Sequence, residues 1–382
     1  MVQRTWFKSF LGVLLVLSFL TFFGCQEEKA TQKAAPAAAK TEAPAVAVPN
    51  RIDMSIPQQI SLRVSYDDPT LWPAKENVPD PEHAFAVLFK DYVERSSAGK
   101  IKVELFGSGA LGSYRQTLEM VQNGSLDINI GTGSLANFFK EIQLLAIPYV
   151  FMSDDVVQEF FNGSSLWREL MEKMEKDTGM KYLAIGQNGW RNFTNNARVI
   201  RKPDDLKGLK FRVMESPVYI KFIESMGGRA VPIAWNEVYT ALQTGVVDGH
   251  ENPISPIYLG KIYEVQKYLT MDGHIWSENI MVMNSAKFKS LPVAAQQIIL
   301  QGAKLGAQAN DVAERMVSNI VKYEIVAKRM QVYFPTQEEK DAFKKVSQPA
   351  VVEYLQGQLG KELVDRFLKE VDLAEQRAGW RK

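Results

Sequence analysis

Two segments of the chain follow the same pattern and lie 121 positions apart. The first, Tyr114 to Asp127, ends in Gln-Asn-Gly-Ser-Leu-Asp, and the second, Trp235 to Asp248, ends in Gln-Thr-Gly-Val-Val-Asp. Each reads as an aromatic residue, an amphipathic helix, a glycine suited to a left-handed helix cap, and a short apolar strand. Chance similarity between two helix-turn-strand units is the alternative. The aligned glycine and aspartate favour two similarly built lobes, and small ligands bind in the clefts between such lobes.

The remaining folded part alternates strands with helices. Residues 60–66 and 100–106 have strand patterns, and the helical spacing of apolar residues from Phe85 to Tyr92 lies between them. A further strand is expected at Ile128 to Ile130, after the helix that contains Leu118 and Val121. Recurrence of strand, helix and strand is typical of a sheet with crossover helices, so the sequence predicts an α/β fold.

The first 25 residues predict export. Basic residues precede an apolar run from Phe10 to Phe23, which is short for a membrane span and well sized for a signal peptide. The run ends at Gly24 and Cys25, and this stretch resembles the lipobox of bacterial lipoproteins, although two phenylalanines replace the usual leucine and small residue. We expect residues 1–25 to be a lipoprotein signal peptide, with Cys25 lipidated and anchoring the protein to a bacterial membrane. Ordinary cleavage nearby and a retained signal anchor are the alternatives.

Composition divides the rest of the chain. Residues 26–57 are rich in Ala, Pro, Lys, Thr, Gln and Glu, with almost no large apolar side chains, which predicts a disordered tether. The remainder is long enough for two domains stabilised by burial, since the single cysteine excludes an intrachain disulfide. The 45 basic and 44 acidic residues nearly balance, so there is no reason to expect a nucleic-acid partner.

Motifs of other functions fail on their context. The stretch Gly107 to Gly112 matches G-x-G-x-x-G but follows the second strand, and no acidic residue stands at the interval of a dinucleotide site, so a tight turn is favoured. His250 and Glu251 begin like a zinc motif, but position 254 is isoleucine. Adjacent acids such as Asp67 and Asp68 are typical of caps and solvated loops. The sequence predicts no enzyme, no cofactor and no metal site.

Two arginines are candidates for binding an acidic ligand. Arg191 lies among aromatic residues where the chain should cross to the second lobe, and Arg212 alternates with apolar neighbours from Leu209 to Val213. A guanidinium group presents paired donors that match a carboxylate, and this charge-assisted pair is stronger in a water-poor cleft. A solvated arginine on an edge strand and a merely amphipathic strand are the respective alternatives.

Several stretches resemble the substrate-binding subunits of tripartite ATP-independent periplasmic (TRAP) transporters, the DctP-type family. The longest are Lys207-Gly-Leu-Lys-Phe-Arg-Val213, Asn236-Glu-Val-Tyr-Thr-Ala-Leu-Gln243 and Val247-Asp-Gly-His-Glu-Asn-Pro253. The resemblance runs from about Ile60 into the C-terminal region. It implies a type II periplasmic-binding-protein fold, in which two α/β lobes with a hinge and a long domain-spanning helix close over an organic acid.

The resemblance also implies how the chain is divided. Lobe I should comprise residues 58–188 and 277–317, and lobe II should comprise residues 189–276 and 318–382 with the C-terminal helices. The amphipathic stretch from Val293 to about Met330 fits the domain-spanning helix, with docking to a membrane partner as a second possibility.

Site residues follow from the same family. Arg212 inherits the role of holding the ligand carboxylate, and Arg191 gives a second cationic contact. Asn252 should hydrogen-bond the same carboxylate, and Trp235 should pack on the ligand.

Two departures from the family limit this transfer. His250 replaces the usual glutamine and would tune the charge of the pocket or, as we favour, pack behind Asn252. Thr132 falls nearest to the position at which relatives that bind sialic acid carry a glutamate, which argues against sialic acid. The long loop after Tyr66, including Trp72, should also face the cleft.

The expected protein is therefore an extracytoplasmic receptor that delivers an organic acid to a TRAP membrane permease. Sugar acids, C4-dicarboxylates and aromatic or keto acids all fit the expected site. A sensory or protein-interaction lipoprotein built on the same lobes is the alternative, and a hydrolase is a more distant one.

Overall fold

The computed structural model describes residues 55–69, 80–327 and 330–380, which belong to one compact unit. The signal peptide, Cys25, nearly all of the tether and Trp72 lie outside these residues, so their predictions stay predictions.

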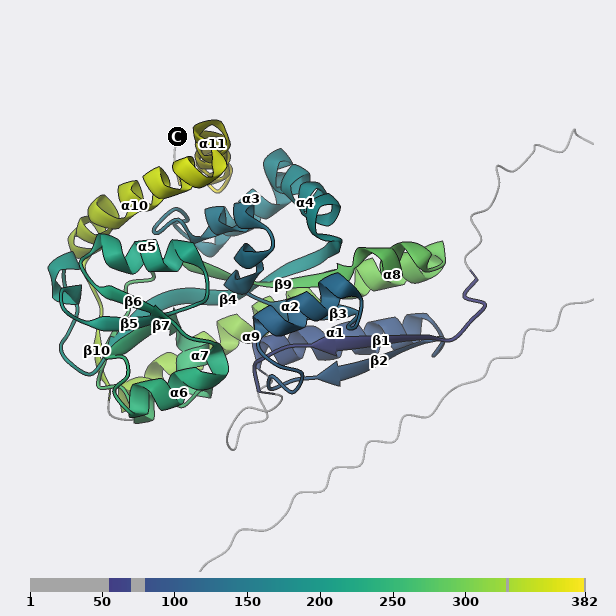
Figure 1. Cartoon of the computed structure of the whole chain (residues 1–382), viewed down its shortest axis with the longest axis horizontal. Helices are drawn as coiled ribbons and strands as arrows, with labels where there is room; N and C mark the ends of the chain where they lie inside the picture. Colours follow the sequence, from purple (N-terminus) through teal and green to yellow (C-terminus); the bar gives the residue numbers. More distant parts are fainter. Residues whose placement is uncertain (1–54, 70–79, 328–329, 381–382) are drawn as a thin grey trace, which may run out of the picture. The chain divides into compact units, whose positions relative to one another are not determined.

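The described strands form a continuous sheet in the order β2-β1-β3-β9-β4-β7-β5-β6, with β8 and β10 attached beside β4 (Figure 1). The 16-residue strand β4 (Met180–Asn195) joins the two halves of this sheet. Its first part pairs with β9 as far as Trp190, and its last part, from Arg191 onward, pairs with β7. We call the β9 side lobe I and the β7 side lobe II. The chain therefore crosses between lobes at the segment where the sequence places Arg191.

Each lobe surrounds its part of the sheet with helices. Lobe I holds the strands β1 (Ile60–Ser65), β2 (Ile101–Phe106), β3 (Ile128–Gly131) and β9 (Trp276–Asn284), and the helices α1 (Pro81–Ser96), α2 (Tyr114–Asn123) and α8 (Ser285–Ser290). Lobe II holds β5 (Lys210–Val213), β6 (Arg229–Pro232), β7 (Gly249–Pro253), β8 (Tyr268–Thr270), β10 (Gln331–Tyr333), α5 (Pro217–Ser225), α6 (Trp235–Gln243) and α7 (Ile254–Leu259). Two helices, α3 (Asp154–Gly163) and α4 (Ser165–Thr178), precede β4. Short 3-10 helices occupy Gly133–Asn137, Lys140–Ala146, Pro203–Leu206 and Ile262–Glu264.

The repeated sequence pattern corresponds to the same unit in each lobe. Helix α2 leads into β3 in lobe I, and α6 leads into β7 in lobe II. The glycine after each helix has the expected left-handed conformation, with φ of 82° at Gly124 and 72° at Gly245. The prediction of two similarly built lobes is thus confirmed at these elements.

The aspartate that ends each repeat has the same structural role. In lobe I, Asp127 Oδ2 accepts a hydrogen bond from the backbone N–H of Arg63 on β1 (2.8 Å). In lobe II, Asp248 Oδ2 accepts one from the backbone N–H of Lys210 on β5 (2.7 Å). Because β1 pairs with β3 and β5 pairs with β7, both in parallel, each aspartate fixes two neighbouring strands at their entry.

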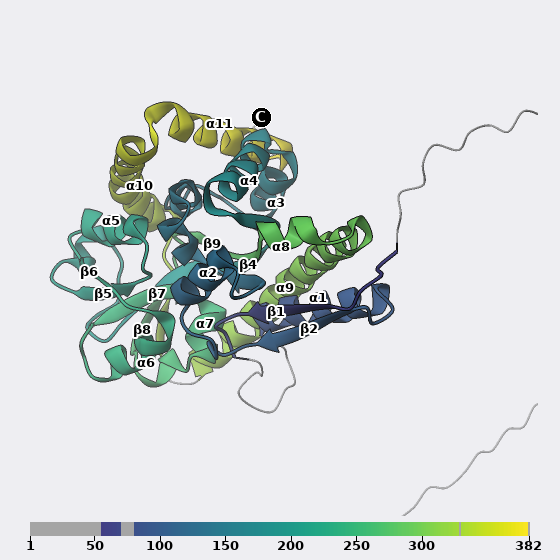
Figure 2. The same ribbon diagram turned by 45° about the vertical axis from the view of Figure 1, so that its right-hand side comes forward.

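Helix α9 (Val293–Ala327) spans both lobes, as predicted. It packs against α1 of lobe I, along β4, and against α7 of lobe II, and Figure 2 shows it running from α8 toward α7. The C-terminal helices α10 (Gln337–Leu359) and α11 (Lys361–Arg377) pack on α5 and α3, respectively. A capping box of Thr336 and Glu339 begins α10. The predicted residue bounds of the lobes stay a prediction.

None of the helices in the described ranges is both long enough and apolar enough to cross a lipid bilayer.

Replacing Gly306 of α9 with alanine is expected to destabilise the fold, although alanine favours helices. A Cβ there would lie 2.7 Å from the backbone oxygen of Phe85 on α1 and 2.8 Å from its ring, so the helices would have to separate. We expect a loss of about 1–3 kcal/mol in the free energy of unfolding, measured by urea denaturation. Gly357→Ala in α10 is the control, since nothing lies within 4 Å of its Cβ, and it should stabilise by about 0.5–1 kcal/mol. A Gly306→Ala protein as stable as the unaltered chain would contradict this account of the α1 and α9 contact.

Candidate ligand-binding site

A pocket lies between the lobes and encloses about 480 Å³ of space free of protein atoms, part of it open to solvent. Lobe I lines it with Asp68, Ser113, Tyr114, Thr132 and Ser134. Lobe II contributes Arg212, Met214, Glu215, Ile233, Ala234, Trp235, Asn252 and Pro256, and β4 contributes Asn188. Four residues predicted from the sequence, namely Arg212, Asn252, Trp235 and Thr132, therefore meet in one pocket.

Arg212 is the buried cation of this pocket. It lies on β5 with only 3% of its surface exposed, and its Nε donates a hydrogen bond to the backbone oxygen of Ile233 (2.8 Å). Its two Nη groups have no hydrogen-bond partner among the described residues. Burial and then the charge of Arg191 lower the pKa of Arg212 to about 10, so it stays protonated at neutral pH. The pocket therefore presents a charged fork of donors to which the described part of the chain supplies no acceptor.

Three other predicted residues surround this cation. Trp235 is the first residue of α6, and its ring centroid lies 5.9 Å from the guanidinium carbon of Arg212. Asn252 lies on β7 beside β5, and its side chain makes no hydrogen bond within the described part of the chain. Thr132 follows β3 on the opposite lobe, where its hydroxyl lies 3.3 Å from that of Ser277. An anionic group, an amide partner and an apolar body would all find matching surfaces here.

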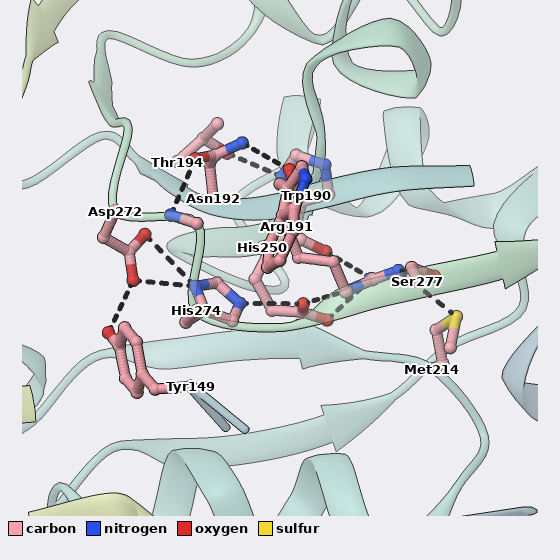
Figure 3. A network of polar contacts seen from close by, with 12 residues as sticks. Tyr149, Trp190, Arg191, Asn192, Thr194, Met214, His250, Asp272, His274 and Ser277 are labelled. Atoms are coloured by element: carbon pink, nitrogen blue, oxygen red, sulfur yellow. Dashed lines mark hydrogen bonds and ion pairs between the residues drawn. The ribbon is translucent and has the colours of Figure 1, made fainter. Parts of the chain in front are cut away.

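Arg191 lies outside the pocket lining and is completely buried (Figure 3). Its guanidinium group forms a two-point ion pair with Glu251, through Nε to Oε2 and through Nη2 to Oε1 (2.9 Å). Its Nη2 also donates to the backbone oxygen of Glu251 (2.8 Å), and Nη1 donates to the hydroxyl of Ser277 (3.3 Å). The structure thus engages Arg191 with the protein itself, and its predicted contact with a ligand stays a prediction.

The ion pair continues into a buried polar chain (Figure 3). His274 Nε2 lies 3.2 Å from Glu251 Oε2, His274 Nδ1 lies 2.9 Å from Asp272 Oδ2, and the hydroxyl of Tyr149 donates to Asp272 (2.8 Å). Burial works to raise the pKa of Glu251, but Arg191 and His274 hold it at about 2. Burial also works to lower the pKa of His274, but the two carboxylates raise it. In its protonated form, a histidine between two carboxylates donates from both ring nitrogens.

His250 is buried behind the pocket and does not line it. Its Nδ1 lies 2.6 Å from the hydroxyl of Thr194, and its Nε2 has no partner among the described residues. Burial, followed by the charge of Arg212, lowers the pKa of His250 to about 3. The sequence interpretation favoured a structural role for His250, packed behind Asn252, and this role stays a prediction.

Tyr66 is likewise buried rather than exposed to the pocket. Its hydroxyl lies 2.5 Å from Nδ1 of His83, where burial and the nearby carboxylates keep its pKa far above the ordinary value. The loop that follows it reaches the pocket at Asp68. Direct ligand contacts of Tyr66 and His250 therefore stay predictions.

Sequence reasoning missed Tyr114 and Asp68, although the internal repeat contained a signal for both. Tyr114 stands at the same repeat position as Trp235, and the two aromatic residues line the pocket from opposite lobes. Arg63 and Lys210 make equivalent backbone contacts in the two lobes. Asp68 lies as many positions after Arg63 as Glu215 lies after Lys210, so the two acids are equivalent, and both line the pocket. The interpretation of Asp67 and Asp68 as solvated was wrong, since both are buried beneath Tyr114 and α1.

Four buried carboxyl groups, those of Asp67, Asp68, Asp80 and Glu82, gather on the lobe I side of the pocket, and the charge of Glu314 on α9 acts on this cluster. Burial raises the pKa of Asp67 to about 8, that of Asp68 to about 7 and that of Glu314 to about 8. Burial, reinforced by repulsion from Asp68, raises the pKa values of Asp80 and Glu82 well above their ordinary range. No cluster of His, Cys, Asp and Glu within the described residues has the arrangement of a metal site. Each of these carboxyl groups thus keeps its proton to a higher pH than it would in the unfolded chain.

The melting temperature is expected to fall as the pH rises from about 5 to about 8. In the unfolded chain Asp67 ionises near pH 3.8, whereas the folded state keeps its proton up to about pH 8. The folded state thus binds more protons across this interval, and its stability declines as pH rises. His274 has the same sign, because its raised pKa stabilises the folded state below pH 6.5 and this stabilisation is lost as pH rises through the folded pKa.

Two histidines oppose this trend. Burial lowers the pKa of His83, and burial with the charge of Arg212 lowers that of His250 to about 3, so both destabilise the folded state as pH falls below 6.5. They are outnumbered by the carboxyl groups whose pKa is raised. Circular dichroism melts at half-unit steps of pH would measure the slope, and Asp67→Asn should flatten it. A melting temperature that is constant or rises between pH 6 and pH 8 would refute the protonated cluster.

Two lobes built on one shared sheet, with a pocket between them and a helix that spans both, define the class of periplasmic solute-binding proteins. The sequence profile of the DctP family, described as bacterial extracellular solute-binding protein, family 7, matches residues 75–358. The chain belongs to this family, whose members are receptors of TRAP transporters and not enzymes. The predicted resemblance and the predicted fold are thereby confirmed.

Individual relatives agree with this assignment. A solute-binding protein of Verminephrobacter eiseniae is 39% identical over 223 residues, which cover 58% of this chain and 66% of the relative. The C4-dicarboxylate-binding protein DctB of Bacillus subtilis is 31% identical over 293 residues, covering 76% of this chain and 82% of DctB. The crystal structure of the sugar acid binding protein DctPAm of Advenella mimigardefordensis with galactonate superposes with a TM-score of 0.77 at 29% identity, covering 83% of this chain and 99% of the other.

Proposed function

We propose that this protein is a receptor that binds an organic acid through a carboxylate clamp and delivers it to a TRAP-type membrane permease. Arg212 is the centre of the clamp, and Asn252 hydrogen-bonds the same carboxylate. The observation that carries the proposal is the free donor fork of Arg212, which is buried, charged and part of the pocket lining.

A carboxylate satisfies what this cation lacks. Burying a charge without a partner costs several kcal/mol, and the described residues supply a partner only to Nε of Arg212. A bidentate carboxylate supplies two charge-assisted hydrogen bonds in a site that excludes most water. Its geometry matches the planar fork of guanidinium better than that of any single-point acceptor.

The other predicted residues take supporting roles in this proposal. Trp235 packs on the body of the ligand, and Thr132 reaches it from lobe I. Arg191 adds positive potential from behind, since its charge already acts on Arg212 across the pocket wall. His250 and Tyr66 hold the pocket walls in place through their contacts with Thr194 and His83.

The acids open to this receptor are sugar acids, C4-dicarboxylates and aromatic or keto acids. Relatives support the first two classes, since one binds galactonate and another is a C4-dicarboxylate-binding protein. Lipidation at Cys25 would hold the receptor at the membrane surface, within reach of the permease. A sensory or protein-interaction lipoprotein would use the same lobes without needing a small acid.

A thermal-shift screen of the protein lacking residues 1–25 tests the proposal. The panel contains sugar acids, C4-dicarboxylates, and aromatic and keto acids. A ligand that binds only the folded state should add about 2.7 kcal/mol of stability at a hundredfold excess over its dissociation constant. No shift with any acid would reject the carboxylate receptor and favour the protein-contact alternative.

A further inference from the structure

A second cavity lies on the other side of β4 from the ligand pocket. It encloses about 1630 Å³ of space free of protein atoms, part of it open to solvent. The linings of the two spaces share no residue. Asn188 lines the ligand pocket, whereas its neighbours Gln187 and Gly189 line this cavity. Because successive residues of a strand point to opposite faces, β4 separates the two spaces.

This cavity lies at the hinge, and we call it the hinge cavity. Three segments that pass between the lobes contribute to its lining, namely residues between 187 and 192 of β4, residues 271–273 between β8 and β9, and residues between 314 and 322 of α9. Helix α10 closes another side. Closure of two lobes changes the backbone angles of the segments that join them, so the shape of this cavity should depend on the arrangement of the lobes.

One wall of the hinge cavity carries cations that have no acidic partner. Lys340 and Lys344 lie one turn apart on α10 and are partly buried. Lys322 comes from α9, and its Nζ lies 5.5 Å from the centroid of the Phe334 ring. Among the described residues, no carboxylate lies within 4.0 Å of any of these three ammonium groups. Three positive charges are therefore available to an anion.

The acids of the same lining are already engaged or exposed. Four of the five accept hydrogen bonds from other side chains of the lobes and helices, namely Asp154 from Trp190, Asp272 from Tyr149, Glu314 from Ser255 and Asp341 from Gln337. Burial also raises the pKa of Glu314 to about 8. The fifth, Asp155, is exposed in the first turn of α3, where a negative charge stabilises the helix. The fourth cation, Arg315, lies 3.6 Å from Asp154.

The rest of the lining suits an aromatic body. It contains three aromatic rings, two methionines and an isoleucine, namely Tyr149, Phe151, Trp190, Met152, Met271 and Ile254. Aromatic rings pack against one another in offset or edge-to-face arrangements, and methionine sulfur makes favourable contacts with rings. A concave, mostly apolar space with a few charged groups is the usual form of a small-molecule site.

We propose that the hinge cavity is a second binding site, which takes an anion with an aromatic body, and that its occupancy is coupled to that of the ligand pocket. The anionic group lies among Lys322, Lys340 and Lys344, and the aromatic body lies against the rings and methionines. Coupling follows because a molecule that contacts all three connecting segments favours one arrangement of the lobes. The site is independent of the proposed carboxylate clamp, whereas the coupling rests on it.

Fluorescence titration with 8-anilinonaphthalene-1-sulfonate (ANS) and N-phenyl-1-naphthylamine tests the site. The two dyes share one aromatic skeleton, and only ANS carries an anionic group. The unaltered protein should bind ANS at least about tenfold more tightly, and the double variant Lys340→Gln, Lys344→Gln should lose about tenfold or more of the ANS affinity. Its affinity for the uncharged dye should stay within about twofold. Equal affinity of the unaltered protein for both dyes would overturn the anion site.

Lys345→Gln is the matched control for Lys344→Gln. Both variants remove one positive charge from α10, but Lys345 is exposed and outside the lining. Lys344→Gln should weaken ANS binding by about threefold or more, and Lys345→Gln by less than about twofold. Equal effects would assign the selectivity to the general field of the protein and overturn the site. A loss of ANS binding in Arg212→Ala would place the dye in the ligand pocket and also overturn it.

The coupling is tested by repeating the ANS titration in the presence of a saturating organic acid from the thermal-shift screen. The dissociation constant of ANS should change by at least about fivefold, and ANS should change that of the acid by the same factor. An unchanged constant overturns the coupling. If no acid raises the melting temperature, the proposed clamp fails. ANS binding that depends on Lys340 and Lys344 would still support the hinge site in that case.

Discussion

Arg212→Ala is expected to weaken binding of the acid by about 30-fold or more, and to abolish its thermal shift at moderate excess. Truncating one partner of a buried, hydrogen-bonded charge pair costs about 2–5 kcal/mol, because the other charge is left without its counterpart. Each 1.4 kcal/mol corresponds to about a tenfold change in dissociation constant. Isothermal titration with the acid identified in the screen would measure the loss.

Two further variants sharpen this experiment. Arg212→Lys keeps the charge but removes the planar fork, so its affinity should fall between those of the unaltered and alanine proteins. Arg229→Ala removes an exposed arginine from the neighbouring strand β6 and should leave affinity unchanged. Equal affinity in Arg212→Ala and the unaltered protein would show that the acid binds elsewhere.

Glu251→Ala is expected to destabilise the folded protein by about 3–5 kcal/mol. The variant leaves Arg191 completely buried without its carboxylate and removes one of the two acceptors of His274. Arg191 and His274 lie near the point where β4 crosses between the lobes, so the loss of stability should extend to the hinge. Urea denaturation, compared at equal pH, gives the change in the free energy of unfolding.

The matched comparison is the double variant Arg191→Met, Glu251→Met. Replacing a buried ion pair by apolar side chains of similar volume is often neutral, so the double variant should be more stable than Glu251→Ala. A double variant that is more stable than Glu251→Ala would show that the loss of stability comes from the unpaired charge of Arg191. A loss below about 1 kcal/mol in Glu251→Ala would show that water or another group compensates Arg191.

Local signals predicted the elements that position the pocket. The repeat from Tyr114 to Asp127 and from Trp235 to Asp248 gave two equivalent units, and both aspartates fix neighbouring strands as equivalent units should. Helix caps and strand alternation depend on residues close in sequence, which is why α10 begins where its capping box predicts. The ligand contact of Trp235 was implied by the family resemblance, and Trp235 lines the pocket.

The two arginines show that local sequence signals do not predict which partners a buried side chain has. Arg191 and Arg212 both stand on strands near the crossing. The family resemblance implies that Arg212 holds the ligand carboxylate and that Arg191 gives a second cationic contact. No local signal indicated that Arg191 also pairs with Glu251, 60 residues away on β7. Only the register between β4 and β7 brings this carboxylate to it, and that register depends on the whole sheet.

Adjacent acids show the same limit. Asp204 and Asp205 lie in the first turn of a short helix, as a local interpretation predicts. Asp67 and Asp68 look alike in sequence but are covered by Tyr114 and by Glu82 of α1. Burial by distant segments changes both their protonation and their access to the pocket.

The sequence by itself determined the family, the α/β alternation, the two equivalent lobes and the strand that carries Arg212. All of these depend on short-range pattern and composition, which the chain encodes residue by residue. Tertiary structure decided which polar groups keep free donors or acceptors in the pocket. Arg191 pairs with Glu251 and Asp68 is buried at the pocket wall, because pairing and desolvation are set by partners far away in the chain.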